Sequence, residues 1–462
     1  MSARNAPPSA SEDVRDALRR QRPRSAELYE AACALIPSGT VSRARILPPF
    51  PFFAAHGKGS RLVDVDGNEY VDCAMGFGFN LLGHAHPIVV SAVRESVADG
   101  IGYGTPHPRE VELARLLVDA IPCAGKVTFC NSGSEATLNA VRIARAVTGK
   151  SGIAKFEGGY HGWYDAVLGS VGFDPARSGP VEDPAFVGLS IGVPAENLAH
   201  THVLPFNDDA AFDKIRRLRG ELAVVLVEGV QGVGGSIPAR REFLQELRRV
   251  CTDSDVLLLV DEIVTGFRLA RGGAQEHFGV TADLATYSKA IGAGLPLGVI
   301  AGTDKVMSVL GSTGDPARDL IERAYYGGTF NGCVPAMAVG IAVLSHLNAH
   351  PEIYTRLNAM GEMLRSALNA MVRAHDFPAT AVGAGSLFML RFVTGEVRSV
   401  RDLAGENRRA YAELFPRLIR RGVFVPNTHF GLLSAAHTDD DLQRIVDAHE
   451  GALREMRELG VL

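Results

Sequence analysis

Three short, mostly apolar runs constrain the fold of this chain most strongly, because they lack the regular alternation of a strand with one wet face. They are KVTFC (126–130), LAVVLVE (222–228) and VLLLVD (256–261). Strands of this kind are covered on both faces, as in a parallel sheet packed between helices. From about residue 108 the runs alternate with helical patterns, so the sequence predicts an α/β fold with a mostly parallel sheet.

Polar residues follow these runs where each strand is expected to end. In an open α/β sheet the carboxyl ends of the strands form the edge at which ligands bind. After the first run, Ser132, Gly133 and Ser134 lead into a helix, where backbone N–H groups and hydroxyls favour an anion such as phosphate. The same residues also suit an ordinary helix cap, with Asn131 or Ser134 at the N-cap position.

Two carboxylates end the other runs, Glu228 after LAVVLV and Asp261 after VLLLV. A carboxylate at a strand end is most often a solvated loop residue. It can instead hold a cation. A protonated pyridine nitrogen is such a cation and would donate a strong, charge-assisted hydrogen bond to the carboxylate. The sequence leaves both interpretations open.

Lys289 stands in the apolar, glycine-rich stretch DLATYSKAIGAGLPLG (283–298), and only seven of the 47 basic residues in the chain are lysines. A lysine in such surroundings can extend its ammonium group to water. Alternatively, desolvation lowers its pKa enough for it to form an imine with a carbonyl compound.

Composition narrows the class of protein. The 462 residues carry a net charge of only −5, so neither a nucleic-acid partner nor an anionic membrane surface is expected. No apolar run approaches the roughly 20 residues that span a bilayer, and the N-terminus lacks the apolar core of a secretory signal. Six cysteines without C-x-x-C spacing indicate reduced thiols in a cytoplasmic protein. The histidines at 84, 86 and 161 lack a further ligand at metal spacing, so no metal is expected.

A phosphate cup, a carboxylate and an imine-forming lysine are together the anchors of pyridoxal 5′-phosphate. Their order resembles the class III aminotransferases of the fold-type I pyridoxal-phosphate enzymes, and within them the glutamate-1-semialdehyde 2,1-aminomutase branch. The resemblance runs from about residue 28 to the C-terminus. Its stretches are LLGHAHP (81–87), GGYHGWYD (158–165), VEGVQGVGG (227–235), DEIVTGFR (261–268), SKAIGAGLPLG (288–298), GGTFNGCVPAMAVG (327–340) and LLSAAHTDDDL (432–442).

The resemblance implies a role for each matching residue. Lys289 would be the Schiff-base lysine and Asp261 the partner of the pyridine nitrogen. Tyr160 would stack on the ring with Ile263 on the opposite face. The remaining cofactor-binding positions are Ser132, Gly133 and Ser134 at the phosphate, His161 and Glu228 near the ring, and Thr329, which would reach the phosphate from the neighbouring subunit of a homodimer.

The resemblance also implies the domain organisation. We expect a large domain with a mostly parallel sheet between helices, and a smaller α+β domain built from the N- and C-terminal segments. The expected divisions are a disordered tail (1–25), an N-terminal segment with a β-hairpin around Asp66-Gly67-Asn68 (26–75), the cofactor-binding domain (76–330) and a linking helix with the C-terminal domain (331–462).

The implied activity is transfer of an amino group between an amino acid or related amine and a keto or aldehyde acceptor. The alternative is an intramolecular isomerase, either of the glutamate-1-semialdehyde 2,1-aminomutase type or an amino-acid racemase or epimerase. A more distant alternative is a non-catalytic sensor with the same fold.

Two stretches bear on the substrate. IPSGTVSRAR (36–45) resembles the aminomutase stretch whose arginine binds a substrate carboxylate, which implies Arg45, or failing that Arg43. PNTHFGLLSAAHT (426–438) has no acid where the aminomutase has a glutamate, and ILPPFPFF (46–53) is rich in aromatic residues. Both departures favour a more apolar or aromatic amino compound as substrate, including a β-amino acid.

Overall fold

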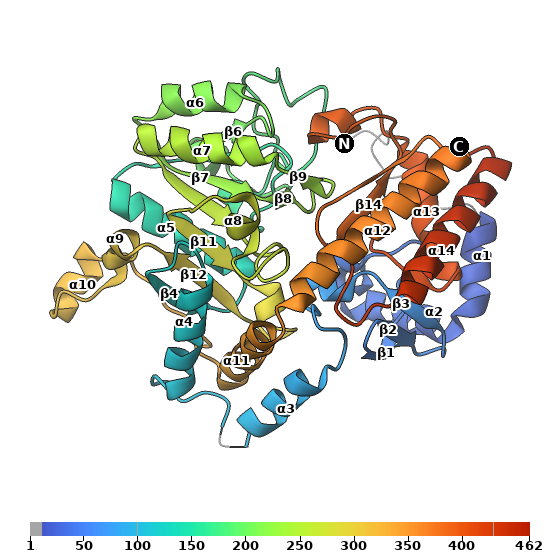
Figure 1. The fold of residues 1–462 in the computed structure, drawn as a ribbon, viewed down its shortest axis with the longest axis horizontal. Coiled ribbons are helices and arrows are strands. Elements are labelled where there is room, and N and C mark those ends of the chain that lie inside the picture. The colour runs from blue at the N-terminus through green and yellow to red at the C-terminus, as the bar shows by residue number, and fades with distance from the viewer. Residues whose placement is uncertain (1–11, 99, 428) are drawn as a thin grey trace. The chain divides into compact units, whose positions relative to one another are not determined.

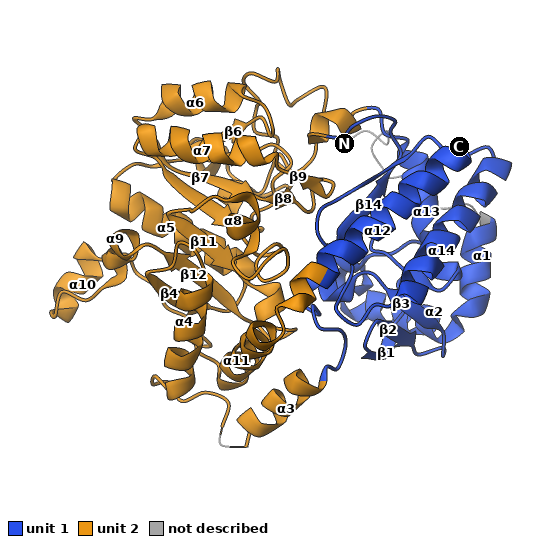
Figure 2. Cartoon of the chain, in the orientation of Figure 1, with its two compact units in different colours: residues 1–86, 356–397, 405–462 blue, residues 87–355, 398–404 orange. Residues whose placement is uncertain are grey.

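The structure is a computed structural model that describes residues 12–98, 100–427 and 429–462 (Figure 1). The chain divides into two compact units (Figure 2). Unit 1 comprises residues up to 86, 356–397 and 405–462, and unit 2 comprises residues 87–355 and 398–404.

Unit 2 is built on a seven-stranded sheet with the strand order β4-β12-β11-β10-β7-β5-β6. Its strands are β4 (Lys126–Cys130), β5 (Gly152–Phe156), β6 (Thr201–Leu204), β7 (Leu222–Glu228), β10 (Leu257–Asp261), β11 (Leu284–Tyr287) and β12 (Gly298–Gly302). Neighbouring strands from β6 to β11 pair in parallel, and β12 alone is reversed, because it pairs antiparallel with both β11 and β4. The predicted α/β fold with a mostly parallel sheet is confirmed.

Helix α5 (Gly133–Thr148) covers one face of this sheet. Its buried alanines and Ile143 pack with Leu226 of β7, Leu259 of β10 and Ile300 of β12. Helix α7 (Arg241–Asp253) also packs on the sheet, where Phe243 contacts Phe156 of β5 with ring centroids 5.6 Å apart. The central strands are therefore covered by apolar side chains, as their lack of alternation predicts.

The other elements of unit 2 are α3 (Pro87–Ser96), α4 (Pro108–Ala120), α6 (Ala210–Leu218), β8 (Val230–Gln231), β9 (Ile237–Pro238), α8 (Gly273–Phe278), α9 (Asp304–Met307), α10 (Pro316–Glu322) and α11 (Val334–Ala349). Helix α11 corresponds to the linking helix predicted after residue 330. Helix α12 (Glu352–Ala374) begins in unit 2 and continues in unit 1.

Unit 1 has a four-stranded sheet in the order β1-β2-β3-β15 and a three-stranded sheet in the order β13-β14-β16. The predicted hairpin is present, since β2 and β3 pair antiparallel on either side of Asp66-Gly67-Asn68. The elements are α1 (Glu12–Gln21), α2 (Pro23–Leu35), β1 (Ala54–Lys58), β2 (Arg61–Asp64), β3 (Glu69–Asp72), β13 (Thr380–Val382), β14 (Leu387–Arg391), α13 (Arg408–Arg420), β15 (Val423–Phe424), β16 (Gly431–Leu432) and α14 (Asp439–Glu458).

The structure differs from the predicted disordered tail over residues 1–25, because α1 and the start of α2 fall inside it. Val14 and Leu18 are four residues apart on α1 and are both completely buried against Tyr70 and Ile419. This i, i+4 apolar pair gives the helix a packing face despite its many charges. Residues 1–11 lie outside the described part of the chain.

The unit boundaries also differ from the predicted ones. The division falls after residue 86 and after residue 355, rather than after 75 and 330, and residues 398–404 return to unit 2. Helix α11 belongs to unit 2 because it packs against α3 and α4 of that unit. None of the helices in the described ranges combines the length and apolarity that crossing a membrane requires.

Candidate active site

The candidate site is assembled by the register of three parallel strands. Asp261 at the end of β10 lies opposite Glu228 of β7 on one side and opposite Thr286 of β11 on the other. Side chains alternate between the faces of a strand, so Asp261 shares a face with Leu259, and Glu228 shares one with Leu226. Leu226 and Leu259 pack against α5, so both carboxylates project from the face that α5 covers.

Asp261 is held by a buried hydrogen-bond network. Its Oδ2 atom lies 2.8 Å from Nδ1 of His161, and its Oδ1 atom accepts the backbone N–H of Ile263 at 3.1 Å. Nδ1 of His161 donates to the carboxylate, and burial lowers the pKa of the imidazole even though Asp261 opposes that shift. The arrangement fixes the orientation of the Asp261 carboxylate.

Glu228 accepts two backbone N–H groups, from Tyr160 at 2.8 Å and from Gly232 at 3.1 Å. Burial raises the pKa of its carboxyl to about 8, and the nearby negative charge of Asp261 acts in the same direction. Burial, with Asp261 and Glu228, likewise raises the pKa of Tyr160. Two buried acids close to one another create a strong demand for a cation at this position.

Lys289 supplies a cation at this place. It follows β11 by two residues and is half-buried. Burial lowers the pKa of its amine to about 8, while the charges of Asp261 and Glu228 oppose the shift and Arg268 adds to it. Its backbone has a φ of 43°, in the left-handed region that non-glycine residues rarely adopt. Strain of this kind persists where the surrounding structure imposes it, commonly at functional sites.

The N-terminus of α5 forms a cradle on the same face. Ser132 is its N-cap, and the Ser132 hydroxyl accepts the backbone N–H of Glu135 at 3.2 Å. A Cβ atom at Gly133 would lie 2.7 Å from Cδ1 of Ile263, so the backbone approaches Ile263 closely here. Ser134 approaches Gly162 in the same way, with its Oγ 2.8 Å from the position of an added Cβ. The first N–H groups of a helix have no partner within the helix, so a helix N-terminus of this kind suits an anion.

The structure therefore brings together most of the residues predicted for the site. Asp261, Glu228 and Lys289 interact through their charges, and His161, Tyr160 and Ile263 join them through hydrogen bonds. Gly133 and Ser134 adjoin this cluster through Ile263 and Gly162. Thr329 is exposed in the loop between α10 and α11 and does not join the cluster within its own chain.

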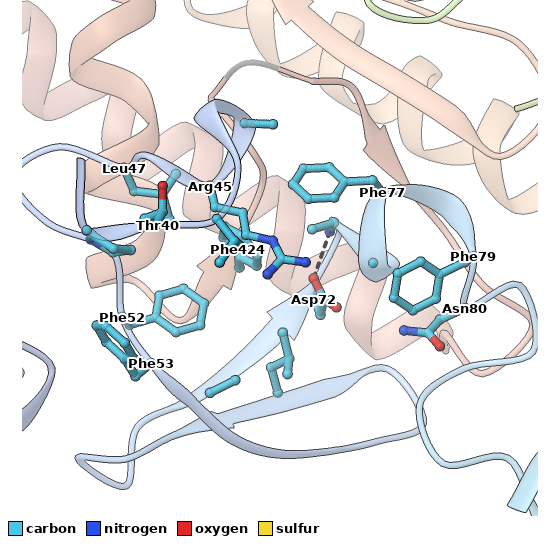
Figure 3. A pocket seen from close by; sticks show the side chains of 18 of the residues that line it. Thr40, Arg45, Leu47, Phe52, Phe53, Asp72, Phe77, Phe79, Asn80 and Phe424 are labelled. Atoms are coloured by element: carbon cyan, nitrogen blue, oxygen red, sulfur yellow. Dashed lines mark hydrogen bonds between the residues drawn. The ribbon is translucent and has the colours of Figure 1, made fainter. Parts of the chain in front are cut away.

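The predicted substrate arginines belong to unit 1. Arg45 lines a cavity of 590 Å³ within that unit (Figure 3), whereas Arg43, two residues away, does not line it. Both side chains are exposed.

Sequence reasoning missed Lys155, which is completely buried in β5 and donates a hydrogen bond to the carbonyl oxygen of Gly169. Burial lowers the pKa of its amine to about 7, with Glu228 and Glu157 opposing the shift. Glu157 in turn pairs with Arg401, whose Nε atom lies 2.6 Å from its Oε2 atom. Lys155 could have been found by the signal that marked Lys289, a rare lysine inside an apolar run.

Across the described residues, no group of three or more His, Cys, Asp or Glu side chains is arranged to hold a metal ion.

The chain is similar over most of its length to class III aminotransferases. The family described as Aminotransferase class-III matches residues 43–447. The glutamate-1-semialdehyde 2,1-aminomutase of Methanosarcina acetivorans is 36% identical over 429 residues, which cover 92% of this chain and 97% of that protein. An omega-transaminase from Sphaerobacter thermophilus is 34% identical with a TM-score of 0.87, covering 94% of this chain and 98% of the other. A transaminase solved with PLP bound is 31% identical with a TM-score of 0.83, covering 95% and 99%.

Proposed function

Because the chain belongs to the class III aminotransferases, we propose that it is a pyridoxal 5′-phosphate-dependent enzyme that moves an amino group, with Lys289 as the residue that holds the cofactor. The observation that carries this assignment is the meeting of Lys289 with Asp261 and Glu228 on one face of the sheet. A lysine with a lowered pKa is partly neutral near pH 8, and the neutral amine is the form that attacks an aldehyde.

Two features of the site fit the cofactor. Nε2 of His161 is buried and has no hydrogen-bond partner among the described residues, which suits a polar group of a ligand lying beside it. At the other end, glycine at position 133 keeps clear the space beside Ile263 that a side chain would fill. A cleared space next to the exposed N–H groups of a helix N-terminus is suited to a phosphate.

When bound, pyridoxal 5′-phosphate supplies an aldehyde that combines with amines and a pyridine ring that withdraws electrons. Lys289 Nζ would hold the aldehyde carbon covalently and, once displaced by a substrate amine, would move the proton at the substrate Cα. Asp261 would keep a proton on the ring nitrogen through a charge-assisted hydrogen bond. His161 would hold the Asp261 carboxylate in position from the other side.

The remaining assignments follow the family resemblance. The ring would lie between Tyr160 and Ile263, and the phosphate on Ser132, Gly133 and Ser134. Thr329 would reach the phosphate of the partner's site in a homodimer, a role that its exposed position permits. Arg45, rather than Arg43, would bind a substrate carboxylate. We also propose that the protein is cytoplasmic.

Two types of amino transfer use this same residue set. Intermolecular transfer was the first expectation from the sequence, and the name of the Sphaerobacter transaminase agrees with it. The name of the curated relative, glutamate-1-semialdehyde 2,1-aminomutase, favours the intramolecular alternative more strongly. The residues around Lys289 and Asp261 would serve either type of transfer. The two types differ in whether the amino group is passed to a second substrate or returns to the same molecule.

Borohydride reduction tests the cofactor assignment. Protein loaded with pyridoxal 5′-phosphate and treated with borohydride should carry the pyridoxyl group on the peptide containing Lys289. Lys289→Ala should abolish this labelling, whereas Lys305→Ala, which removes an exposed lysine of the same unit, should leave it unchanged. Labelling of the Lys289→Ala protein at the wild-type level would overturn the assignment.

Dependence on a second substrate distinguishes the two types of transfer. An intramolecular enzyme turns over an amino aldehyde without an added keto acid, whereas an intermolecular one stops after a single turnover until a keto acid is supplied. Loaded protein that shows neither behaviour towards a panel of amino compounds would favour the non-catalytic sensor instead.

A further inference from the structure

A loop that directly follows β5 carries two residues of the candidate site, Tyr160 and His161. We refer to residues 157–168 as the site loop. Lys155 lies in β5 just before this loop, and its ammonium group donates a hydrogen bond to the carbonyl oxygen of Gly169 just after it. Lys155 therefore joins the two ends of the site loop.

The acceptor of this hydrogen bond belongs to paired backbone. The N–H of Gly158 donates to the carbonyl oxygen of Ser170 at 2.7 Å, and the N–H of Ser170 donates to the carbonyl oxygen of Val187 at 2.8 Å. Gly169 itself forms an antiparallel bridge with Gly188. The Gly169 carbonyl is thus held in place from its other side, so it is a firm attachment point for a side chain.

The middle of the site loop contacts the candidate site at three points. The backbone N–H of Tyr160 donates to Glu228 at 2.8 Å. Nδ1 of His161 lies 2.8 Å from Asp261, and the carbonyl oxygen of His161 accepts the hydroxyl of Thr137 at 2.6 Å. A displacement of the site loop would therefore move both the Tyr160 ring and the imidazole that orients Asp261.

Lys155 projects from the same face of the sheet as the carboxylates of the site. It pairs in register with Leu226 of β7, and Ile153, two residues earlier in β5, packs with Leu226 in the cluster beneath α5. Side chains alternate along a strand, so Lys155 lies on the face that α5 covers, as Glu228 does. Its charge also acts on the site, because burial lowers the pKa of His161 and Lys155 adds to that shift.

Burial of this ammonium group is costly to the fold. Lys155 is completely buried, and burial lowers the pKa of its amine to about 7 although Glu228 and Glu157 oppose the shift. Its hydrogen bond goes to a neutral carbonyl group rather than to a carboxylate. A methionine of similar length would fill the same space without burying a charge. The contact that this lysine adds is its attachment to the end of the site loop.

We propose that Lys155 is a positioning residue for the proposed reaction, because it fastens the end of the site loop to β5 and so holds Tyr160 and His161 at the cofactor site. It acts through the loop and takes no part in making or breaking bonds. The attachment of the loop stands on the contacts above, whereas its consequence for the cofactor rests on the proposed function.

The first test uses full-length protein without cofactor. Lys155→Met removes the hydrogen-bond donor and keeps the length of the side chain. In hydrogen exchange followed by mass spectrometry, peptides of the site loop should exchange about five-fold faster or more, because one hydrogen bond is lost, while β7 and β10 stay unchanged.

Lys150→Met is the matched control for this substitution. Lys150 lies just before the other end of β5, and its Nζ atom also donates to a backbone carbonyl, that of Asp255 at 2.7 Å. Its replacement therefore removes the same kind of hydrogen bond away from the site loop. Exchange of the site loop in Lys150→Met should equal that of the wild type.

The second test uses protein loaded with pyridoxal 5′-phosphate. A bound chromophore shows circular dichroism in its own absorption band only where asymmetric surroundings hold it in a fixed orientation. Lys155→Met should reduce this signal per bound cofactor and weaken cofactor affinity about ten-fold in equilibrium dialysis, whereas Lys150→Met should change neither. A lysine that only supports the fold would lower the unfolding temperature and leave the signal per bound cofactor unchanged.

A double substitution tests whether Lys155 acts through the loop. Lys155→Met should weaken cofactor affinity by a smaller factor in protein that already carries Tyr160→Ala, because the ring that the loop positions is then absent. Equal factors in the two backgrounds would contradict action through Tyr160 and overturn the proposal.

Unchanged exchange of the site loop in Lys155→Met, or equal effects of Lys155→Met and Lys150→Met, would also overturn the proposal. Lys155→Leu serves the same purpose if thermal unfolding shows that Lys155→Met has not folded. If borohydride trapping on Lys289 fails while the site loop still exchanges faster in Lys155→Met, the proposed function fails and the attachment of the loop by Lys155 stands.

Discussion

At the scale of single residues, the environment of Lys289 sets a definite pH range for its chemistry. With a pKa of about 8, roughly a tenth of these amines are neutral at pH 7, against fewer than one in a thousand for an ordinary lysine. The charges of Asp261 and Glu228 keep the pKa of the Lys289 amine from falling further. Both the neutral and the protonated amine are therefore present near pH 8.

The rate at which Lys289 is labelled by pyridoxal 5′-phosphate should follow this pKa. The neutral fraction grows about ten-fold per pH unit below the pKa and levels off above it. Timed borohydride quenching should therefore show labelling that rises steeply from pH 6 to pH 8 and flattens beyond. N-acetyl-lysine amide under the same conditions corrects for titration of the reagent. A Lys289 rate that keeps rising in parallel with this compound above pH 9 would contradict the lowered pKa.

Lys155 should make stability depend on pH in the alkaline range. Its pKa is about 7 in the folded protein and 10.5 in the reference state, so between these values the unfolded chain binds more protons. The free energy of unfolding therefore gains up to about 1.4 kcal/mol per pH unit as pH rises through this window.

Urea unfolding of cofactor-free protein, followed by circular dichroism, checks the contribution of Lys155. The free energy of unfolding of the wild type minus that of Lys155→Met should increase from pH 7 to pH 9. The lost hydrogen bond to Gly169 adds an offset that does not change with pH, so only the slope is diagnostic. A difference that stays constant across this range would contradict the assignment.

At the scale of elements, the N-terminus of α5 packs closely against Ile263 in the turn after β10. Gly133→Val would place its side chain against Ile263, because even a Cβ there would lie 2.7 Å from Ile263 Cδ1. We expect about ten-fold or greater loss of cofactor affinity, since both the cradle and the side chain beside it must move. Equilibrium dialysis with pyridoxal 5′-phosphate measures this loss.

The other end of α5 provides the comparison for this substitution. Gly149 caps the helix with a φ of 68° and has open space around its Cα, so Gly149→Ala strains the cap without approaching the cradle. It should lower the unfolding temperature and leave cofactor affinity unchanged. Equal losses of affinity in the Gly133 and Gly149 variants would show that the cradle has no specific role.

At the scale of the whole molecule, unit 1 is assembled from three separate stretches of chain, so it should lose its structure cooperatively. Gly361 of α12 packs so closely on the turn at Gly385 that an added Cβ would lie 1.8 Å from the Gly385 carbonyl oxygen. Gly361→Ala should therefore destabilise unit 1 by about 3 kcal/mol, the upper end of the usual cost of core overpacking.

Hydrogen exchange followed by mass spectrometry locates the effect. Peptides of β2, β3 and α14 should lose protection together with α12 in Gly361→Ala, while β7 and β10 of unit 2 keep theirs. Gly405→Ala, where an added Cβ meets nothing within 4 Å, should leave the whole pattern unchanged. Loss of protection confined to α12 would show that the three stretches do not unfold together.

From the sequence came strands β4, β7 and β10 and the hairpin at Asp66-Gly67-Asn68, and Lys289 and Asp261 stood out as candidates whose roles the family resemblance implied. The strands, the hairpin and the choice of candidates follow from local signals: runs of apolar residues, turn residues, and charges placed among or directly after apolar runs. The same local signal would have found Lys155, had it been applied to every lysine.

Which side chains meet one another is set by the three-dimensional packing of the chain. The register of β10 with β7 places Glu228 beside Asp261, and His161 reaches Asp261 across 100 residues of sequence. The structure also showed that α1 packs in a region expected to be disordered, and that five phenylalanines surround one cavity. Contacts between distant segments depend on how strands pair and helices pack, and a pattern read along the chain contains no distance between them.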